Sequence, residues 1–95
     1  MSLQFEWDEN KARSNARKHG LTFEEASSAF ADPLAAIFGD VSHSAAESRE
    51  ILIGHSSGGR LVVVSFTERS DSVRIISARR ASSRERSDYE RGFAP

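Results

Sequence analysis

The chain has 95 residues, of which 38% are hydrophobic and 28% charged, with a net charge of −1 and no cysteine. This length suits one domain over residues 1–95 and leaves no room for a second core. Without cysteine, disulfides, redox pairs and thiolate metal sites are excluded. The sequence shows no apolar run long enough to cross a bilayer and no signal-peptide core, so we expect a cytoplasmic protein without membrane contacts.

The two halves of the chain differ in charge. Residues 1–40 carry four basic and seven acidic side chains, whereas residues 41–95 carry nine basic and seven acidic ones. All nine basic residues of the second half are arginine, whose planar guanidinium grips phosphate or carboxylate in two places. This bias predicts a surface that holds a polyanion, with RNA as the first candidate.

The chain begins with a predicted strand and helix. Phe5–Trp7 is a short apolar strand candidate. Asp8 is a suitable N-cap for a helix that continues to about Lys18, and Gly20 suits the position just after its end.

A second helix is expected over residues 22–31. Thr22 and Glu25 form a capping box at its start, and apolar residues follow at helical spacing. Pro33 cannot continue a helix and disfavours helical backbone before it, so the helix ends there. From Leu34 onward the apolar residues recur with the period of strands.

The second half of the chain predicts strands and a final helix. The strand candidates are Leu34–Phe38, Arg49–His55, Leu61–Phe66 and Val73–Arg80. A polar loop over 39–47, a hairpin turn at 57–59 and a turn over 68–72 separate them. Ser82 and Glu85 form a capping box for a helix ending near Gly92. The order β-α-α-β-β-β-β-α predicts an α+β domain, with helices packed on an antiparallel meander over residues 34–80.

The last predicted strand carries the arginines that most strongly suggest a binding site. Strict alternation places Arg74 and Arg80 on one face and Arg79 on the other. Arg80 also precedes a helix N-terminus, where free N–H groups and the helix dipole favour an anion. In the alternative interpretation, these arginines only pair with acidic neighbours: Glu68, Glu85 or Glu90.

Lys18 and His19, just before Gly20, form the second candidate site. A Lys-His pair at the end of a helix usually compensates the helix dipole. In the functional interpretation, Lys18 binds phosphate while His19 exchanges protons near neutral pH. The remaining histidines, His43 and His55, show no metal-ligand spacing, so we expect neither a metal site nor a cofactor.

These motifs, in this order, resemble those of the BrnT toxins of bacterial type II toxin–antitoxin systems. The resemblance covers nearly the whole chain, including Phe5-Glu-Trp7-Asp8, Lys18-His19-Gly20, Phe30-Ala-Asp32-Pro33, Thr67-Glu68-Arg69 and Arg74-Ile-Ile-Ser-Ala-Arg79-Arg80. It implies a RelE-like fold and a ribonuclease that inhibits translation. It also implies neutralisation by a BrnA-type antitoxin with a ribbon-helix-helix part, through which the complex would contact DNA only indirectly.

The implied reaction uses the 2′-hydroxyl of RNA as its nucleophile and needs no metal. We expect charge on the phosphoryl oxygens to be stabilised by arginine: Arg74, Arg79 or Arg80. Lys18 would clamp a phosphate, and three residues are candidates for proton transfer: His19, Glu68 and Tyr89. Further contacts to RNA are assigned to Lys11, Arg69 and Arg84.

The competing hypothesis is a non-catalytic module that binds a partner protein through its arginine-rich sheet face. RNA cleavage by the wild type and by Arg80→Ala would discriminate between the two. If Arg80 serves catalysis, its replacement leaves the thermal midpoint nearly unchanged while cleavage collapses.

Overall fold

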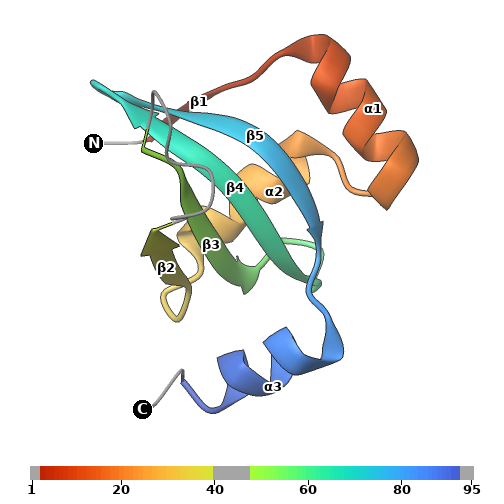
Figure 1. The fold of residues 1–95 in the computed structure, drawn as a ribbon, viewed down its shortest axis with the longest axis vertical. Helices are drawn as coiled ribbons and strands as arrows, with labels where there is room; N and C mark the ends of the chain where they lie inside the picture. Colours follow the sequence, from red (N-terminus) through yellow and green to blue (C-terminus); the bar gives the residue numbers. More distant parts are fainter. Residues whose placement is uncertain (1–2, 40–47, 93–95) are drawn as a thin grey trace.

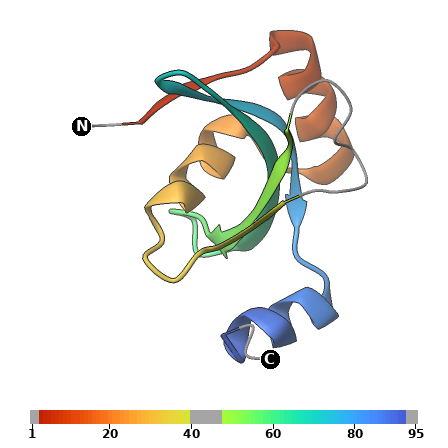
Figure 2. The same cartoon turned by 60° about the vertical axis from the view of Figure 1, so that its left-hand side comes forward.

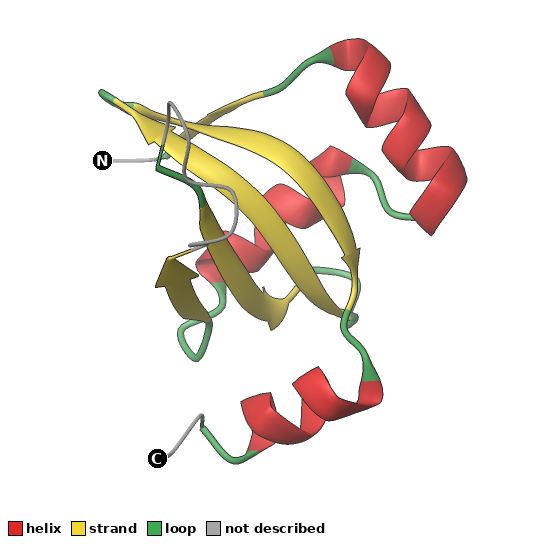
Figure 3. Ribbon diagram, viewed as in Figure 1, coloured by secondary structure: helices red, strands yellow, loops and turns green. Residues whose placement is uncertain are grey.

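Five strands and three α-helices make up the part of the chain that a computed structural model describes, residues 3–39 and 48–92. The strands form one sheet in the order β1-β5-β4-β3-β2 (Figures 1 and 3). The elements are β1 (Gln4–Glu6), α1 (Glu9–His19), α2 (Phe23–Ser28), the 3₁₀ turn η1 (Ala29–Ala31), β2 (Ala36–Gly39), β3 (Glu50–His55), β4 (Leu61–Arg69), β5 (Ser72–Arg80) and α3 (Ser83–Glu90). This order confirms the predicted α+β class.

Strands β2 to β5 form the predicted antiparallel meander, in which each strand pairs with the next one in sequence. At the other edge, β1 pairs in parallel with β5, so that Phe5 lies beside Val73. Because β1 pairs only with Ser72, Val73 and Arg74, it leaves the rest of that edge of β5 to another partner.

The predicted boundaries differ most from those observed at three places. The second helix is α-helical only to Ser28 and then tightens into η1. β2 begins at Ala36, two residues later than predicted, because the chain first makes a turn at Pro33. β4 continues to Arg69, which leaves only two residues for the turn expected over 68–72. The loop expected over 39–47 lies, apart from its first residue, outside the described part of the chain.

The predicted caps of α1 and α3 are confirmed in detail, whereas at α2 only Thr22 Oγ1 acts as predicted, accepting from Glu25 N–H at 3.0 Å, because the Glu25 carboxylate pairs with Arg60 instead. The Asp8 side chain accepts a hydrogen bond from Lys11 N–H at 3.0 Å, which caps α1. Gly20 follows α1 with φ at 65°, a left-handed conformation that glycine adopts without steric cost. Ser82 and Glu85 make both bonds of the capping box that begins α3.

The two faces of the sheet carry separate apolar clusters. The larger cluster lies on the face that packs against α2 and η1, which we call the α2 face. Its largest fully buried members are Phe23, Phe66, Leu21, Leu52 and Ile75. On the opposite face, which we call the α3 face, a smaller cluster packs against Tyr89 of α3: Ile53, Leu61 and Val63. α3 follows the end of β5 and lies away from α2 (Figures 1 and 2).

A β-bulge interrupts the pairing of β4 with β5. Ser65 pairs with Ser77, but the next residue of β4, Phe66, pairs with Ile75, so Ile76 is an extra residue in β5. One extra residue shifts the alternation of side chains by one position. Every side chain after the bulge therefore points to the face opposite to the one that strict alternation predicts.

The prediction that Arg74 and Arg80 share a face is wrong for this reason. Ile75 and Ala78, three residues apart, are both buried in the cluster of the α2 face. Arg80 follows Ala78 by two positions and lies on that same face. Arg74 and Arg79 instead share the α3 face, about 13 Å apart at roughly 3.3 Å per regular residue.

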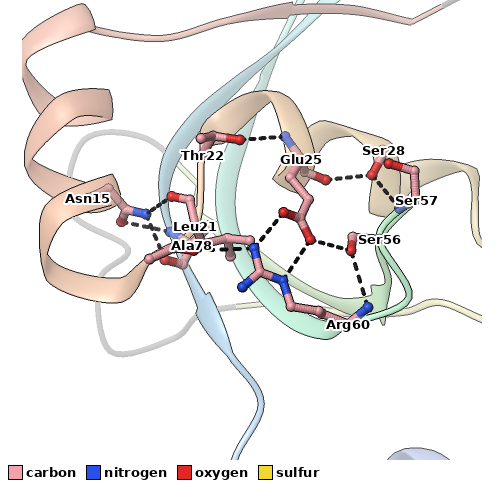
Figure 4. A network of polar contacts seen from close by, with 10 residues as sticks. Asn15, Leu21, Thr22, Glu25, Ser28, Ser56, Ser57, Arg60 and Ala78 are labelled. Atoms are coloured by element: carbon pink, nitrogen blue, oxygen red, sulfur yellow. Dashed lines mark hydrogen bonds and ion pairs between the residues drawn. The ribbon is translucent and has the colours of Figure 1, made fainter.

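Asn15 closes the edge of β5 beyond the end of β1 (Figure 4). Its Nδ2 donates to the carbonyls of Ala78 and Leu21 at 2.8 and 3.0 Å, and its Oδ1 accepts from Ala78 N–H at 3.1 Å. The two bonds to Ala78 are those that a neighbouring strand would make. Asn15 thus fixes the position of β5 next to Arg79.

Candidate active site on the α3 face

Arg79 joins the end of β5 to α3. Its Nη1 and Nη2 donate to the two carboxylate oxygens of Glu85 at 2.8 and 2.9 Å, and Nη1 also reaches Arg80 C=O at 3.3 Å. This geometry confirms that Arg79 is an ion-pair partner of Glu85, and the hydrogen bond from Arg79 lowers the pKa of Glu85 to about 2. These contacts with described residues use three of the five guanidinium donors, so two remain for a ligand.

The start of α3 is less open to an anion than the sequence suggests. Ser82 N–H donates to Glu85 Oε1 at 2.8 Å, and Glu85 N–H donates to Ser82 Oγ at 3.1 Å. The capping box therefore occupies two of the backbone donors that were expected to meet a phosphate beside Arg80.

Tyr89, a predicted proton-transfer residue, lies in a cluster with Asp32 and His55. Its hydroxyl donates to Asp32 Oδ2 at 2.7 Å, and the same oxygen accepts the backbone N–H of His55 at 2.7 Å. The Nδ1 of His55 lies 3.2 Å from the Tyr89 hydroxyl oxygen and 3.6 Å from Asp32 Oδ2. The two rings meet edge to face, with their centres 5.1 Å apart.

These contacts assign the tautomer of neutral His55. Because the Tyr89 hydroxyl donates its hydrogen to Asp32, its oxygen accepts from His55, and the ring hydrogen is therefore on Nδ1. The lone pair is then on Nε2. The His55 side chain is 43% exposed, so a ligand on the α3 face can reach it.

The same contacts set the charge states of Asp32 and Tyr89. Burial acts to raise the pKa of Asp32, but hydrogen bonds from the backbone N–H groups of His55 and Leu34 and from Tyr89 outweigh it, and the pKa lies below its ordinary value. Burial, followed by the bond to Asp32, raises the pKa of Tyr89 to about 12. Tyr89 thus stays protonated at neutral pH and serves to orient His55.

Arg74 lies towards the other end of the α3 face. Its Nη1 is 3.8 Å from Glu6 Oε1, and Nε of Arg69 lies 4.0 Å from the same oxygen. Ion pairs of this length between half-exposed side chains contribute little stability. A phosphate can therefore compete with Glu6 for Arg74 at little cost.

The α2 face carries a separate polar network, drawn in Figure 4, whose centre is the ion pair of Glu25 with Arg60. Nε and Nη2 of Arg60 donate to the two Glu25 oxygens at 2.9 and 2.5 Å, and Ser56 Oγ donates to Glu25 at 2.7 Å. Hydrogen bonds from Arg60 and then Ser56 lower the pKa of Glu25 to about 2. Arg60 also donates to Gly20 C=O, so this network ties α1, α2 and the β3–β4 turn together.

The other predicted site residues lie apart from the cluster around Tyr89. Arg80 is exposed on the α2 face, where its charge also lowers the pKa of Glu25. Lys18 is exposed and His19 half-buried, both in the last turn of α1.

Three more candidates are exposed on separate elements. Lys11 lies on α1 and Arg84 on α3, whereas Glu68 lines a hollow on the α2 face. The structure therefore does not bring all the candidates into one site. It groups Arg69, Arg74, Arg79 and Tyr89 on the α3 face.

Two features of the described chain bear on other classes of function. In residues 3–39 and 48–92, no group of three or more His, Asp or Glu side chains is placed to hold a metal ion. None of the helices described is long and apolar enough to cross a membrane. His43, considered above as a metal ligand, lies outside these residues.

Sequence reasoning missed Asp32 and His55 as members of the Tyr89 cluster. Asp32 was interpreted only as the end of the second helix, and His55 only as a metal ligand without a partner. The Tyr89–Asp32 and Tyr89–His55 contacts span 57 and 34 positions of the chain. Local spacing carries no signal for such contacts.

Comparisons with known proteins agree with this fold. A family model described as the ribonuclease toxin BrnT of type II toxin–antitoxin systems matches residues 7–85. A search of curated proteins finds no match. The chain is similar to the crystal structure of the Brucella abortus ribonuclease toxin BrnT, with 28% identity, a TM-score of 0.65, and coverage of 86% of this chain and 100% of that one. The chain belongs to the BrnT family of ribonuclease toxins of type II toxin–antitoxin systems.

Proposed function

We propose that this chain cleaves RNA on its α3 face without a metal ion, by attack of the 2′-hydroxyl on the adjacent phosphate. The observation that carries this proposal is the bulge in β5, which puts Arg74 and Arg79 on the same face. The cleavage would inhibit translation in the cytoplasm, and a BrnA-type antitoxin would neutralise it.

Arg79 is the residue that we assign to the scissile phosphate. Its bond to Glu85 holds the guanidinium in place, while two of its donors stay unused by the described residues. Donors that are positioned in advance stabilise the charge that develops on the phosphoryl oxygens without reorganising during the reaction. Arg74 and Arg69 would hold the RNA strand on either side.

His55 is the residue that we assign to proton transfer. Val63 pairs with Ile53 on one side and with Arg79 on the other, so β3 and β5 are two strand spacings apart, about 10 Å. Tyr89 packs against the cluster of Ile53, Leu61 and Val63 on β3 and β4. A phosphate beside Arg79 therefore lies within reach of His55, which Tyr89 contacts.

In the proposed reaction, Nε2 of His55 takes the proton of the 2′-hydroxyl while the 2′-oxygen forms a bond to phosphorus. The bond from phosphorus to the 5′-oxygen breaks, and the protonated imidazole or water returns a proton to that oxygen. The products are a 2′,3′-cyclic phosphate and a free 5′-hydroxyl. Asp32 and Tyr89 act by orienting His55, which is the arrangement expected of a general base held by a third group.

The experiment that tests this proposal uses one RNA oligonucleotide and the same RNA with a single 2′-deoxy nucleotide at the cleaved bond. We expect the first to be cut in the presence of a chelator and the second to remain intact at that bond. Cleavage of the 2′-deoxy RNA would exclude the 2′-hydroxyl mechanism, and loss of cleavage in the chelator would exclude a metal-free one. A folded protein that binds but never cuts RNA would favour the non-catalytic module.

A further inference from the structure

A hollow of about 700 Å³ lies on the α2 face, away from the proposed RNA site. Its floor is apolar and is formed by Phe30, Leu52, Phe66 and Val73. Leu3 and Ile37, which also line it, are 56% and 52% exposed. Large apolar side chains left in water around an apolar hollow are typical of a surface that a partner covers.

The charge of this hollow excludes the RNA substrate as its occupant. The charged residues in its described lining are all acidic: Asp32, Glu68 and Asp71. Carboxylates at this spacing repel the phosphates of a nucleic acid backbone. A partner with a basic border around an apolar stripe matches both the floor and the rim.

The width of the floor favours a helix over an extended strand. Val73, Phe66 and Leu52 lie on β5, β4 and β3, which are neighbours in the sheet. Two strand spacings amount to about 10 Å, close to the diameter of an α-helix with its side chains. An amphipathic helix seats its apolar stripe in a groove of this width.

We propose that this hollow is the docking site for an amphipathic helix of the cognate antitoxin, whose apolar stripe is flanked by lysine or arginine. Membership of a type II toxin–antitoxin family implies a cognate antitoxin. The proposal adds the surface on which that antitoxin docks and the chemistry of the helix that docks there. It is independent of which residues cleave the RNA.

Asp32 connects this hollow to the Tyr89 cluster. It lines the hollow, and its Oδ2 accepts the hydrogen bonds from Tyr89 and from the backbone of His55. A helix seated in the hollow therefore contacts the residue that orients His55. Binding of the antitoxin helix on the α2 face would in this way affect the orientation of His55 without covering the α3 face.

The test is a calorimetric titration of the toxin with the purified antitoxin encoded beside its gene. We expect Asp71→Lys and Ile37→Ser each to weaken binding at least about 10-fold, since each removes part of the matching surface. The matched control is Leu34→Ser: Leu34 is 75% exposed and apolar but does not line the hollow, so its replacement should leave the affinity unchanged.

Two further measurements separate this proposal from the proposed function. Thermal midpoints check that each variant folds, and because the two substitutions lie in different elements, misfolding of one leaves the other as the test. RNA cleavage by each isolated variant should equal that of the wild type. Wild-type affinity in both hollow variants would overturn the docking site, as would an equal loss of affinity in Leu34→Ser.

Discussion

Asn15 is bonded to both backbone groups of Ala78, so a side chain of α1 does for β5 what a sixth strand would do. Asn15→Ala would leave the N–H and the carbonyl of Ala78 without these partners in a buried position. We expect Asn15→Ala to lose about 2 to 4 kcal/mol in the free energy of unfolding, which denaturant titration measures. Ser14→Ala, at the exposed neighbouring position, should change it by less than about 0.5 kcal/mol.

Arg79→Ala should lower the rate of RNA cleavage by roughly 100-fold or more, because it removes the donors that we assign to the scissile phosphate. Arg79 also holds α3 through Glu85, so the control is Glu85→Gln, which weakens this ion pair but keeps the guanidinium and its donors in the protein. Single-turnover cleavage should fall much less in Glu85→Gln. An equal fall in both variants would mean that Arg79 acts only by positioning α3.

Arg80→Ala should retain more cleavage activity than Arg79→Ala. The reason is its place on the α2 face, opposite to Arg74 and Tyr89. The sequence alone predicted instead that cleavage collapses in Arg80→Ala. The same single-turnover assay, applied to both variants, decides between the two expectations. Greater loss in Arg80→Ala would move the RNA site to the end of α1, where Lys18 and His19 lie.

Tyr89 is the only tyrosine of the chain, so the ultraviolet absorbance of tyrosinate reports on it alone. We expect a midpoint near 12 in the folded protein, because burial and the bond to Asp32 raise the pKa of Tyr89 to about 12. The unfolded chain ionises at the ordinary value of 10, so the stability from this group is present below pH 10 and is lost between pH 10 and 12. Asp32→Asn should lower the midpoint, and an unchanged midpoint would contradict the assigned contact.

Glu25 should govern part of the acid unfolding of the protein. The pKa of Glu25 is about 2 in the folded state against an ordinary 4.5, so its contribution to stability is complete above pH 4.5 and is lost as the pH falls towards 2. Glu25→Gln should be less stable at neutral pH, and its thermal midpoint should fall less steeply between pH 4.5 and 2. The exposed neighbour variant Glu24→Gln should follow the wild-type curve.

Gly54→Ala should perturb the site through Asp32. A methyl group at Gly54 would lie 2.9 Å from Ala35 Cβ, 3.2 Å from Ala29 O and 3.3 Å from Asp32 Oδ2. We expect a loss of about 1 to 3 kcal/mol in stability and a lower pKa of Tyr89, as the carboxylate is displaced. Gly39→Ala is the matched control, since a methyl group there meets no atom within 4 Å.

The sequence predicted those parts of the fold that depend on neighbours in the chain. The caps at Asp8 and Ser82 and the existence of strands β3 and β4 follow from local residue types, and they were predicted correctly apart from the end of β4. The bulge at Ile76 was not, because it exists only in the pairing of β5 with β4 and no residue type marks it. The face assignment of the arginines depended on that one residue.

The candidate site was predictable to a similar extent. Arg74, Arg79 and Tyr89 stand out as residue types suited to RNA chemistry, and the fold places them on one face. Asp32 and His55 gain their roles only when η1, the end of β3 and α3 meet in space. Their residue types were visible in the sequence, but the contact between distant segments was not.

The attachment of α3 has a consequence for how the site assembles. No residue of α3 is buried, and its hydrogen bonds and ion pairs to other described elements are those of Glu85 with Arg79 and of Tyr89 with Asp32 and His55. Helices held by so few contacts detach in local opening reactions well before the whole protein unfolds, and their amide hydrogens exchange correspondingly fast. Each detachment removes Tyr89 from His55 and dismantles the proposed catalytic group. The fraction of time that α3 is docked would therefore scale cleavage at the proposed site, and substitutions along this one helix would tune the potency of the toxin.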